Sequence, residues 1–166
     1  MKHEKPILAL DVDGPINTFG TQDENDVYEC WAGDIPLTIP HAIPEYLRAL
    51  NKRFQIVWYT SWKRTANQKI SPLVGLPTNL PVIDFDRYGC PKLGQSRKFL
   101  GLLGWLKATM SVAVLDDEIG FDMIEWSKKR TAPTLLIQVD PRIGIQSHQV
   151  TQLVDFAKEN SAIEDL

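Results

Sequence analysis

Short apolar segments rich in Val, Ile and Leu alternate along the chain with longer segments in which apolar residues recur at helical spacing. Strands buried on both faces of a parallel sheet are continuously apolar, so this alternation is typical of an α/β fold with crossover helices. We predict strands at about residues 7–11, 55–60, 81–84, 112–116 and 134–139, and helices at about 41–52, 63–70, 95–107, 119–129 and 147–159. The pattern therefore predicts a central, mostly parallel sheet of about five strands covered by helices.

Two irregular segments interrupt this alternation. Residues 15–40 contain Tyr28, Trp31 and three prolines, and they are too many for a bare connection and too few for a second domain. We expect a short flap or hairpin beside the carboxyl end of the first strand. Residues 71–81 contain Gly75 and three further prolines and are expected to form a loop that leads into the third strand. We expect residues 1–166 to form a single domain.

Composition limits the possible size of the core, the charged partners and the cellular location of the protein. With 166 residues and 43% hydrophobic content, the chain can build one sizeable core. The formal charge of −3 implies no global attraction to nucleic acid or to an anionic membrane, although a local basic groove remains compatible with it. Cys30 and Cys90 lack CxxC spacing, which argues against a disulfide framework or a thiolate zinc site. The apolar run before Asp11 is too short for a signal peptide or a membrane span, so we expect a cytoplasmic protein without membrane association.

Two acids follow the first predicted strand, in the run Ile7-Leu8-Ala9-Leu10-Asp11-Val12-Asp13-Gly14. Ligands of open α/β sheets bind at the carboxyl ends of the strands, and two acids there are costly unless they meet a cation. Mg²⁺ would supply that cation, leaving Asp11 to attack phosphorus and Asp13 to exchange a proton with the leaving group or water. Taken alone, the pair is equally compatible with a solvated turn, because Asp-Gly is a common turn sequence.

The second and third predicted strands of the site end in polar residues as well. Thr60 follows an apolar strand, and its hydroxyl could hold a phosphoryl oxygen, with Ser61 as the adjacent alternative. A Thr-Ser pair after a strand is more often a helix cap. Asp116 and Asp117 follow the strand at 112–116, where either acid could complete the oxygen shell of Mg²⁺ together with Asp11 and the backbone carbonyl of Asp13.

A lysine is expected between these elements, because phosphoryl transfer needs a fixed positive charge near the nucleophile. Lys98, which opens the apolar helix at 95–107, is the preferred residue, and Lys92 is the reserve. Either lysine could instead be an ordinary surface charge. The order of acid pair, hydroxyl, lysine and acid pair is far more specific than any one of the four signals.

These residues resemble the four motifs of the haloacid dehalogenase (HAD) superfamily, at Asp11-Val12-Asp13-Gly14, Thr60, Lys98 and Asp116-Asp117. The segments Val57 to Trp62 and Pro133 to Gly144 are similar to small HAD-like domains, some of which are associated with RNA-repair proteins. The resemblance implies a Rossmann-like three-layer α/β/α sandwich and a Mg²⁺-dependent phosphomonoester hydrolase. In that mechanism Asp11 forms an aspartyl-phosphate, Asp13 acts as acid and then base, Thr60 and Lys98 steady the phosphoryl group, and Asp11, Asp13, Asp116 and Asp117 hold the metal.

Two features of the chain qualify the resemblance. Pro15 stands where the family usually carries Thr or Val, so we expect an altered flap geometry. The intervals in which the family inserts a cap domain are short here, which implies an open site. An open site suits a nucleic-acid end, a nucleotide or another large phosphorylated substrate, or else closure by a partner subunit. Four aromatic residues, Trp31, Trp58, Tyr59 and Trp62, could stack a base there. The alternative is that Trp58 belongs to the core and the other three pack under the flap.

The residues alone are also compatible with a second class of protein. A receiver-like or catalytically silent regulatory module also gathers acids, a hydroxyl and a lysine around Mg²⁺ in an α/β sheet. Receivers place the phosphorylated Asp on a later strand, whereas this chain has a DxD motif on its first strand and an acid pair late in the chain. That arrangement favours the phosphatase.

Overall fold

The computed structural model describes residues 5–20, 23, 26–86 and 92–161. Its centre is a parallel sheet with strand order β4-β1-β5-β6. The strands are β1 (Ile7–Leu10), β4 (Gln55–Trp58), β5 (Val112–Asp116) and β6 (Thr134–Gln138). Every residue of β1 and β5 is buried, which explains why both strands are continuously apolar up to their last residue.

The segment predicted as a fifth strand, at 81–84, runs beside β4 without becoming a full strand. Val82 forms an isolated parallel bridge with Trp58. The Trp58 N–H donates to the Pro81 carbonyl at 2.8 Å, and the Ile83 N–H donates to the Trp58 carbonyl at 2.9 Å. Pro81 has no N–H to donate, so the pairing stays short. The sheet thus has four full strands and one bridged segment.

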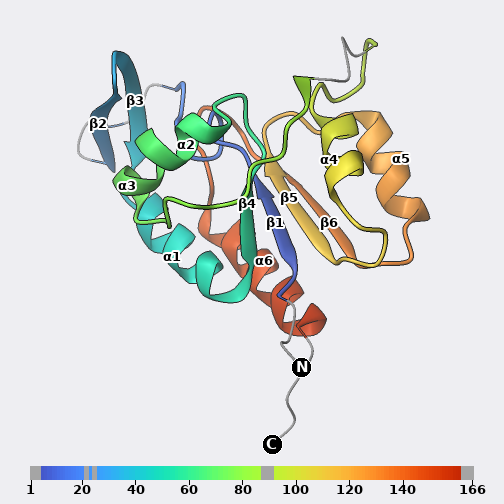
Figure 1. The fold of residues 1–166 in the computed structure, drawn as a ribbon. Coiled ribbons are helices and arrows are strands. Elements are labelled where there is room, and N and C mark those ends of the chain that lie inside the picture. The colour runs from blue at the N-terminus through green and yellow to red at the C-terminus, as the bar shows by residue number, and fades with distance from the viewer. Residues whose placement is uncertain (1–4, 21–22, 24–25, 87–91, 162–166) are drawn as a thin grey trace, which may run out of the picture.

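Helices cover both faces of the sheet and make a three-layer α/β/α arrangement (Figure 1). One face packs against α1 (Ile43–Arg53), α2 (Arg64–Lys69), α3 (Ser71–Val74) and α6 (Ser147–Asn160). The other face packs against α4 (Phe99–Trp105) and α5 (Phe121–Lys129). Successive residues of a strand point to opposite faces, so Leu8 and Leu10 join the first core and Ile7 and Ala9 join the second. The predicted α/β sandwich is confirmed.

The flap segment contains an antiparallel hairpin of β2 (Val27–Ala32) and β3 (Ile35–Pro40). Leu37 and Ile39 are each 2% exposed and attach the hairpin to the core next to α1. Gly33, with φ of 66°, occupies the turn, where a positive φ favours glycine. The hairpin stands above the carboxyl ends of the strands, on the β4 side of the sheet (Figure 1).

Other expectations differ in detail. The segment 71–81 is not entirely a loop, because Ser71–Val74 forms a short helix with proline in its first turn and Gly75 in the left-handed conformation at its end. The helix predicted at 95–107 is shorter, at Phe99–Trp105. Cys30 has a free thiol, and Cys90 lies outside the described residues. Within the described part of the chain, no helix has the length and apolarity needed to cross a membrane.

Candidate active site

The chemically active side chains gather where β1, β4 and β5 end. The Tyr59 N–H donates to the Leu10 carbonyl at 2.8 Å, and the Asp11 N–H donates to the Leu115 carbonyl at 3.1 Å. These bonds continue the sheet by one residue and bring the strand ends together. The chain then leaves β1 through Gly14, whose φ of 99° suits glycine. A Cβ at Gly14 would lie 2.7 Å from Cβ of Asp117, so this turn packs directly on the second acid pair.

Lys98 connects the two acid pairs. Its Nζ lies 2.8 Å from Oδ2 of Asp11 and 2.5 Å from Oδ2 of Asp116. It also donates to the Tyr59 carbonyl at 3.1 Å, and its Nζ lies 4.8 Å from the centre of the Tyr59 ring. Lys98 is only 5% exposed, whereas Lys92 is an exposed residue whose N–H donates to the Gln95 side chain. Of the two lysines that the sequence suggested, the structure brings Lys98 to the acids.

Three carboxylates form a compact cluster around this lysine. One oxygen each from Asp11, Asp116 and Asp117 lies within 4.8 Å of the others. Asp116 is fully buried, and its Oδ1 accepts the Glu118 N–H at 3.0 Å. Its Oδ2 accepts no hydrogen bond of good geometry within the described residues and has only the ion pair with Lys98. A buried carboxylate oxygen in that state is available to a further cation.

The protonation equilibria reflect an excess of negative charge. Burial raises the pKa of Asp116 to about 8, because the loss of hydration and the charge of Asp11 together outweigh the attraction of Lys98. Burial and the Asp11 charge also raise the pKa of Asp117. Burial would lower the pKa of Lys98, but Asp116 and Asp11 outweigh it and the net shift is upward. One ammonium thus does not neutralise three neighbouring carboxylates.

This donor set fits a divalent metal ion. Carboxylate oxygens are the ligands that Mg²⁺ prefers, and a divalent ion would favour the ionised form of all three carboxylates and balance the two negative charges that Lys98 then leaves. Asp11, Asp116 and Asp117 are the residues that would hold it. The Asp13 carboxylate does not belong to this cluster.

The Asp13 carboxylate is instead clamped by two donors on the other side of the strand end. The Trp62 indole Nε1–H donates to Asp13 Oδ2 at 2.9 Å. The Asn17 side-chain amide donates to Asp13 Oδ1 at 2.8 Å. Asn17 in turn accepts the Thr38 N–H of β3 at 2.9 Å. Asp11 and Asp13, which are separated by Val12, are therefore held by different partners.

Thr60 is fully buried at the end of β4. Its hydroxyl oxygen accepts the Trp62 N–H at 3.4 Å, which leaves its O–H free to donate elsewhere. Ser61, the alternative hydroxyl, is exposed and lines a cavity beside Asp13. The Thr60 hydroxyl lies one residue beyond the Tyr59 carbonyl that Lys98 contacts.

Comparison with known proteins identifies the family of the chain. Residues 7–150 match a family described as the HAD domain in Swiss Army Knife RNA repair proteins. The chain belongs to this HAD family. The match spans all four chemistry-bearing elements, from Asp11 to Asp116-Asp117.

The comparisons with curated proteins and with solved structures say less about this chain than the family match does. No curated protein matches this HAD chain. A solved structure of the fission yeast RNA polymerase II CTD phosphatase Fcp1 bound to beryllium fluoride aligns with a TM-score of 0.44 and 13% sequence identity. That alignment covers 95% of this chain and 50% of the Fcp1 chain, so this HAD chain spans half the length of that neighbour. By its family the chain is a HAD domain, and three carboxylates and a lysine gather at its strand ends.

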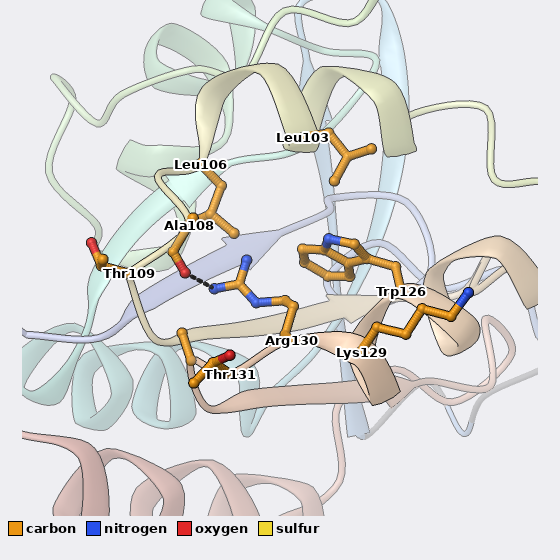
Figure 2. Close-up of a pocket in the computed structure, with 9 residues that line it drawn as sticks. Leu103, Leu106, Ala108, Thr109, Trp126, Lys129, Arg130 and Thr131 are labelled. Carbon is orange, nitrogen blue, oxygen red and sulfur yellow. Dashed lines mark hydrogen bonds between the residues drawn. The ribbon is translucent and has the colours of Figure 1, made fainter.

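Another cavity of this HAD domain lies at the opposite edge of the sheet, where the strands begin (Figure 2). It has a volume of about 780 Å³, and residues that precede β5 and β6 line it, among them Ala108 and Arg130. In Figure 2 the Arg130 guanidinium extends beside the Trp126 ring, 4.8 Å from its centre, and donates to the Ala108 carbonyl at 3.4 Å. No carboxylate lines this cavity. It therefore lacks the chemistry of the site described above.

Two contributors to the HAD site were missed by sequence reasoning. Asn17 lies in the irregular segment after Gly14, and nothing in its neighbours marks it as a partner of Asp13. Phe19 is a single apolar residue in the same segment, yet it is 64% exposed beside the site. The only available signal was the position of both residues directly after the DxD motif. Pro15 is accommodated in the turn, where its carbonyl accepts the Ile145 N–H at 3.0 Å.

Proposed function

We propose that the protein is a Mg²⁺-dependent phosphomonoester hydrolase that works through an aspartyl-phosphate on Asp11. One observation carries this proposal: the buried Lys98 ammonium lies between Asp11 at 2.8 Å and Asp116 at 2.5 Å, within a cluster of three carboxylates. A buried carboxylate with a lysine and a metal-binding cluster beside it can act as a nucleophile toward an anionic phosphoryl group.

In the first step, an oxygen of Asp11 forms a bond to phosphorus while the bond from phosphorus to the leaving-group oxygen breaks. Asp13 gives its proton to that oxygen, so the leaving group departs as an alcohol. Lys98 and the Thr60 hydroxyl steady the charge on the remaining phosphoryl oxygens. Trp62 and Asn17 hold the Asp13 carboxyl in position throughout.

In the second step, a water molecule attacks the phosphorus of the aspartyl-phosphate. Asp13, now a carboxylate, takes a proton from that water, and the bond between phosphorus and the Asp11 oxygen breaks. Inorganic phosphate leaves and both carboxyl groups return to their starting states. Mg²⁺ held by Asp11, Asp116 and Asp117 would supply positive charge that makes the dianionic phosphoryl group attackable.

The substrate class that we propose is a nucleic-acid end, a nucleotide or another large phosphorylated molecule. In the described part of the chain, the segment between β1 and α1 forms a two-stranded hairpin and no separate cap domain, which supports a large substrate. The family description places such domains in RNA repair proteins, which supports a phosphorylated nucleic-acid end.

The test is phosphate release from p-nitrophenyl phosphate and from 5′- and 3′-phosphorylated oligonucleotides, with Mg²⁺ or with EDTA. We expect multiple turnovers with Mg²⁺ only, and a loss on the order of 10³-fold or more in Asp11→Asn. Asp155→Asn is the matched control, because Asp155 is an exposed residue of α6. Wild-type inactivity on every phosphoester, or an active Asp11→Asn, contradicts the proposal.

A second variant separates hydrolysis from a receiver-like role. Asp13→Asn should still be phosphorylated by an aryl phosphate, whose leaving group needs no proton, and should then retain the phosphate because the second step lacks its base. The covalent intermediate would be detected as radioactive phosphate that stays on the Asp13→Asn chain after denaturation. The Asp11→Asn chain should carry no such label. A wild type that takes up one phosphate and releases none would favour the regulatory module.

A further inference from the structure

A cavity of about 610 Å³ lies between the hairpin and the turn that follows β4, and the Asp13 carboxylate belongs to its wall. The remaining wall comes from the turn after β1, from the start of β3, from the turn after β4 and from the start of α2. These residues are Asn17, Phe19, Ile35, Pro36, Ser61, Trp62 and Thr65. The cavity thus adjoins the proton donor of the proposed reaction.

Four of the eight described residues that line this cavity are apolar or aromatic, although the cavity opens to solvent. Phe19 is 64% exposed and Ile35 is 50% exposed, whereas Leu37 and Ile39 anchor the hairpin to the core. Trp31, which is 66% exposed, lies directly opposite Pro36 in the hairpin and shares its face. Exposed apolar residues gathered beside a polar site are typical of a binding surface.

Charge limits what this cavity can accept. Among the described residues that line it, Asp13 is the one charged residue, and none of them is a lysine or an arginine. A second phosphate or a carboxylate seated there would face Asp13 without a counter-charge. An uncharged group with an apolar face meets no such obstacle.

In the proposed reaction, the leaving group lies on the side of the site where Asp13 and this cavity are. Asp13 must lie within hydrogen-bond reach of the leaving oxygen, while phosphorus lies at Asp11. The substrate beyond that oxygen therefore extends from Asp13 into the cavity. This step rests on the proposed function.

We propose that this cavity is the leaving-group subsite and that its occupant is an uncharged planar ring, with Phe19 as the residue that selects it. Phe19 and Trp62 offer ring faces on which a heteroaromatic ring such as a nucleobase stacks. A leaving group without a ring fills the same space with fewer contacts.

A second cavity, of about 750 Å³, lies on the other side of the site and provides the matched control. Asp117, Glu118 and Arg97 line it, and Phe121 is its exposed aromatic residue, at 57%. Asp13 does not line it. If the leaving group lay on that side, Phe121 would take the role that we assign to Phe19.

The experiment compares adenosine 5′-monophosphate with ribose 5-phosphate, which carry the same phosphoester and differ by the base. The readout is the ratio of their kcat/KM values in wild type, Phe19→Ala, Phe19→Trp and Phe121→Ala. We expect the wild type to favour the nucleotide, Phe19→Ala to lower the ratio about tenfold, and Phe19→Trp to keep it. Activity on the nucleotide should fall more than activity on ribose 5-phosphate in Phe19→Ala, because only the nucleotide carries the base that we propose to stack on Phe19.

The outcomes separate the two proposals. An unchanged ratio in Phe19→Ala with full activity, or a ratio that falls in Phe121→Ala instead, overturns the subsite and leaves the phosphatase intact. An equal loss on both substrates in Phe19→Ala, with unchanged thermal unfolding, also overturns it. Wild-type inactivity on both sugar phosphates and on p-nitrophenyl phosphate overturns the proposed function and the subsite together.

Discussion

The two edges of the sheet each hold a partly or fully buried cation beside a cavity, but they pair it with different partners. At the carboxyl edge, Lys98 lies between Asp11 and Asp116. At the amino edge, Arg130 donates to the carbonyls of Ala108 and Met110 and lies against Trp126. Within the described residues, each edge keeps one buried atom without a hydrogen-bond partner, Asp116 Oδ2 at the carboxyl edge and Arg130 Nε at the amino edge. The difference is that Lys98 is paired with carboxylates, whereas Arg130 is paired with neutral groups.

The largest effect should come from removing the lysine of the carboxyl edge. Lys98→Met should lower kcat/KM by about 100-fold or more, because the phosphoryl charge loses its fixed ammonium. In EDTA it should also destabilise the fold, by up to about 3–5 kcal/mol, because Asp11 and Asp116 lose their counter-charge. Steady-state kinetics and urea unfolding measure both effects. Lys92→Met should match wild type, and a Lys98→Met variant with full activity would refute the site.

Asp116→Asn should remove most of the stabilisation that Mg²⁺ confers. A ligand at 100 times its Kd stabilises the native state by about 2.7 kcal/mol, and loss of one carboxylate weakens that binding. Thermal unfolding in EDTA and across a Mg²⁺ titration measures the gain. Asp155→Asn, on the exposed face of α6, should respond as wild type does. If Mg²⁺ stabilised Asp116→Asn as much as it stabilises the wild type, the metal would have to bind elsewhere.

Trp62→Phe keeps the ring and deletes the N–H that Asp13 Oδ2 accepts at 2.9 Å. A hydrogen bond to a charged group contributes about 1.5–3 kcal/mol, so we expect kcat to fall about tenfold. KM for p-nitrophenyl phosphate should change far less, since the phosphoryl contacts remain. Trp126→Phe at the amino edge is the control. A rise in KM with unchanged kcat would assign Trp62 to binding alone.

Arg130→Met should have the smallest effect on catalysis. It deletes the donors to the Ala108 and Met110 carbonyls and should cost about 1–3 kcal/mol of unfolding free energy. The kcat/KM value should equal that of wild type, because the amino edge contributes nothing to the reaction. A selective loss of activity with normal stability would give the amino edge a role that its chemistry does not indicate.

The sequence predicts the carboxyl edge better than its surroundings, for a physical reason. Asp11 and Asp116 each follow a continuously apolar strand, and parallel strands bring such ends to one edge. Lys98 was chosen because it opens an apolar helix, and the structure places it at the N-cap of α4. Thr60 was predicted for the same reason as Asp11, because it comes just after an apolar parallel strand, β4.

The elements that were missed depend on contacts without a periodic signal. Asn17 bonds to Thr38, 21 residues away, across an irregular segment. Pro72 was interpreted as a loop residue, although proline is also favoured in the first turn of a helix such as α3. The segment at 81–84 looked like a strand, but only two backbone hydrogen bonds hold it to β4.

Asn17 makes the position of the acid depend on the position of the hairpin. Its amide links Thr38 of β3 to Asp13 through two hydrogen bonds in series, at 2.9 Å and 2.8 Å. A hydrogen bond weakens steeply beyond about 3.5 Å, so a displacement of β3 by 1 Å breaks one of the two or carries the Asp13 carboxyl with it. A group that displaced the hairpin would therefore also disturb the position of Asp13, the residue that we propose as proton donor.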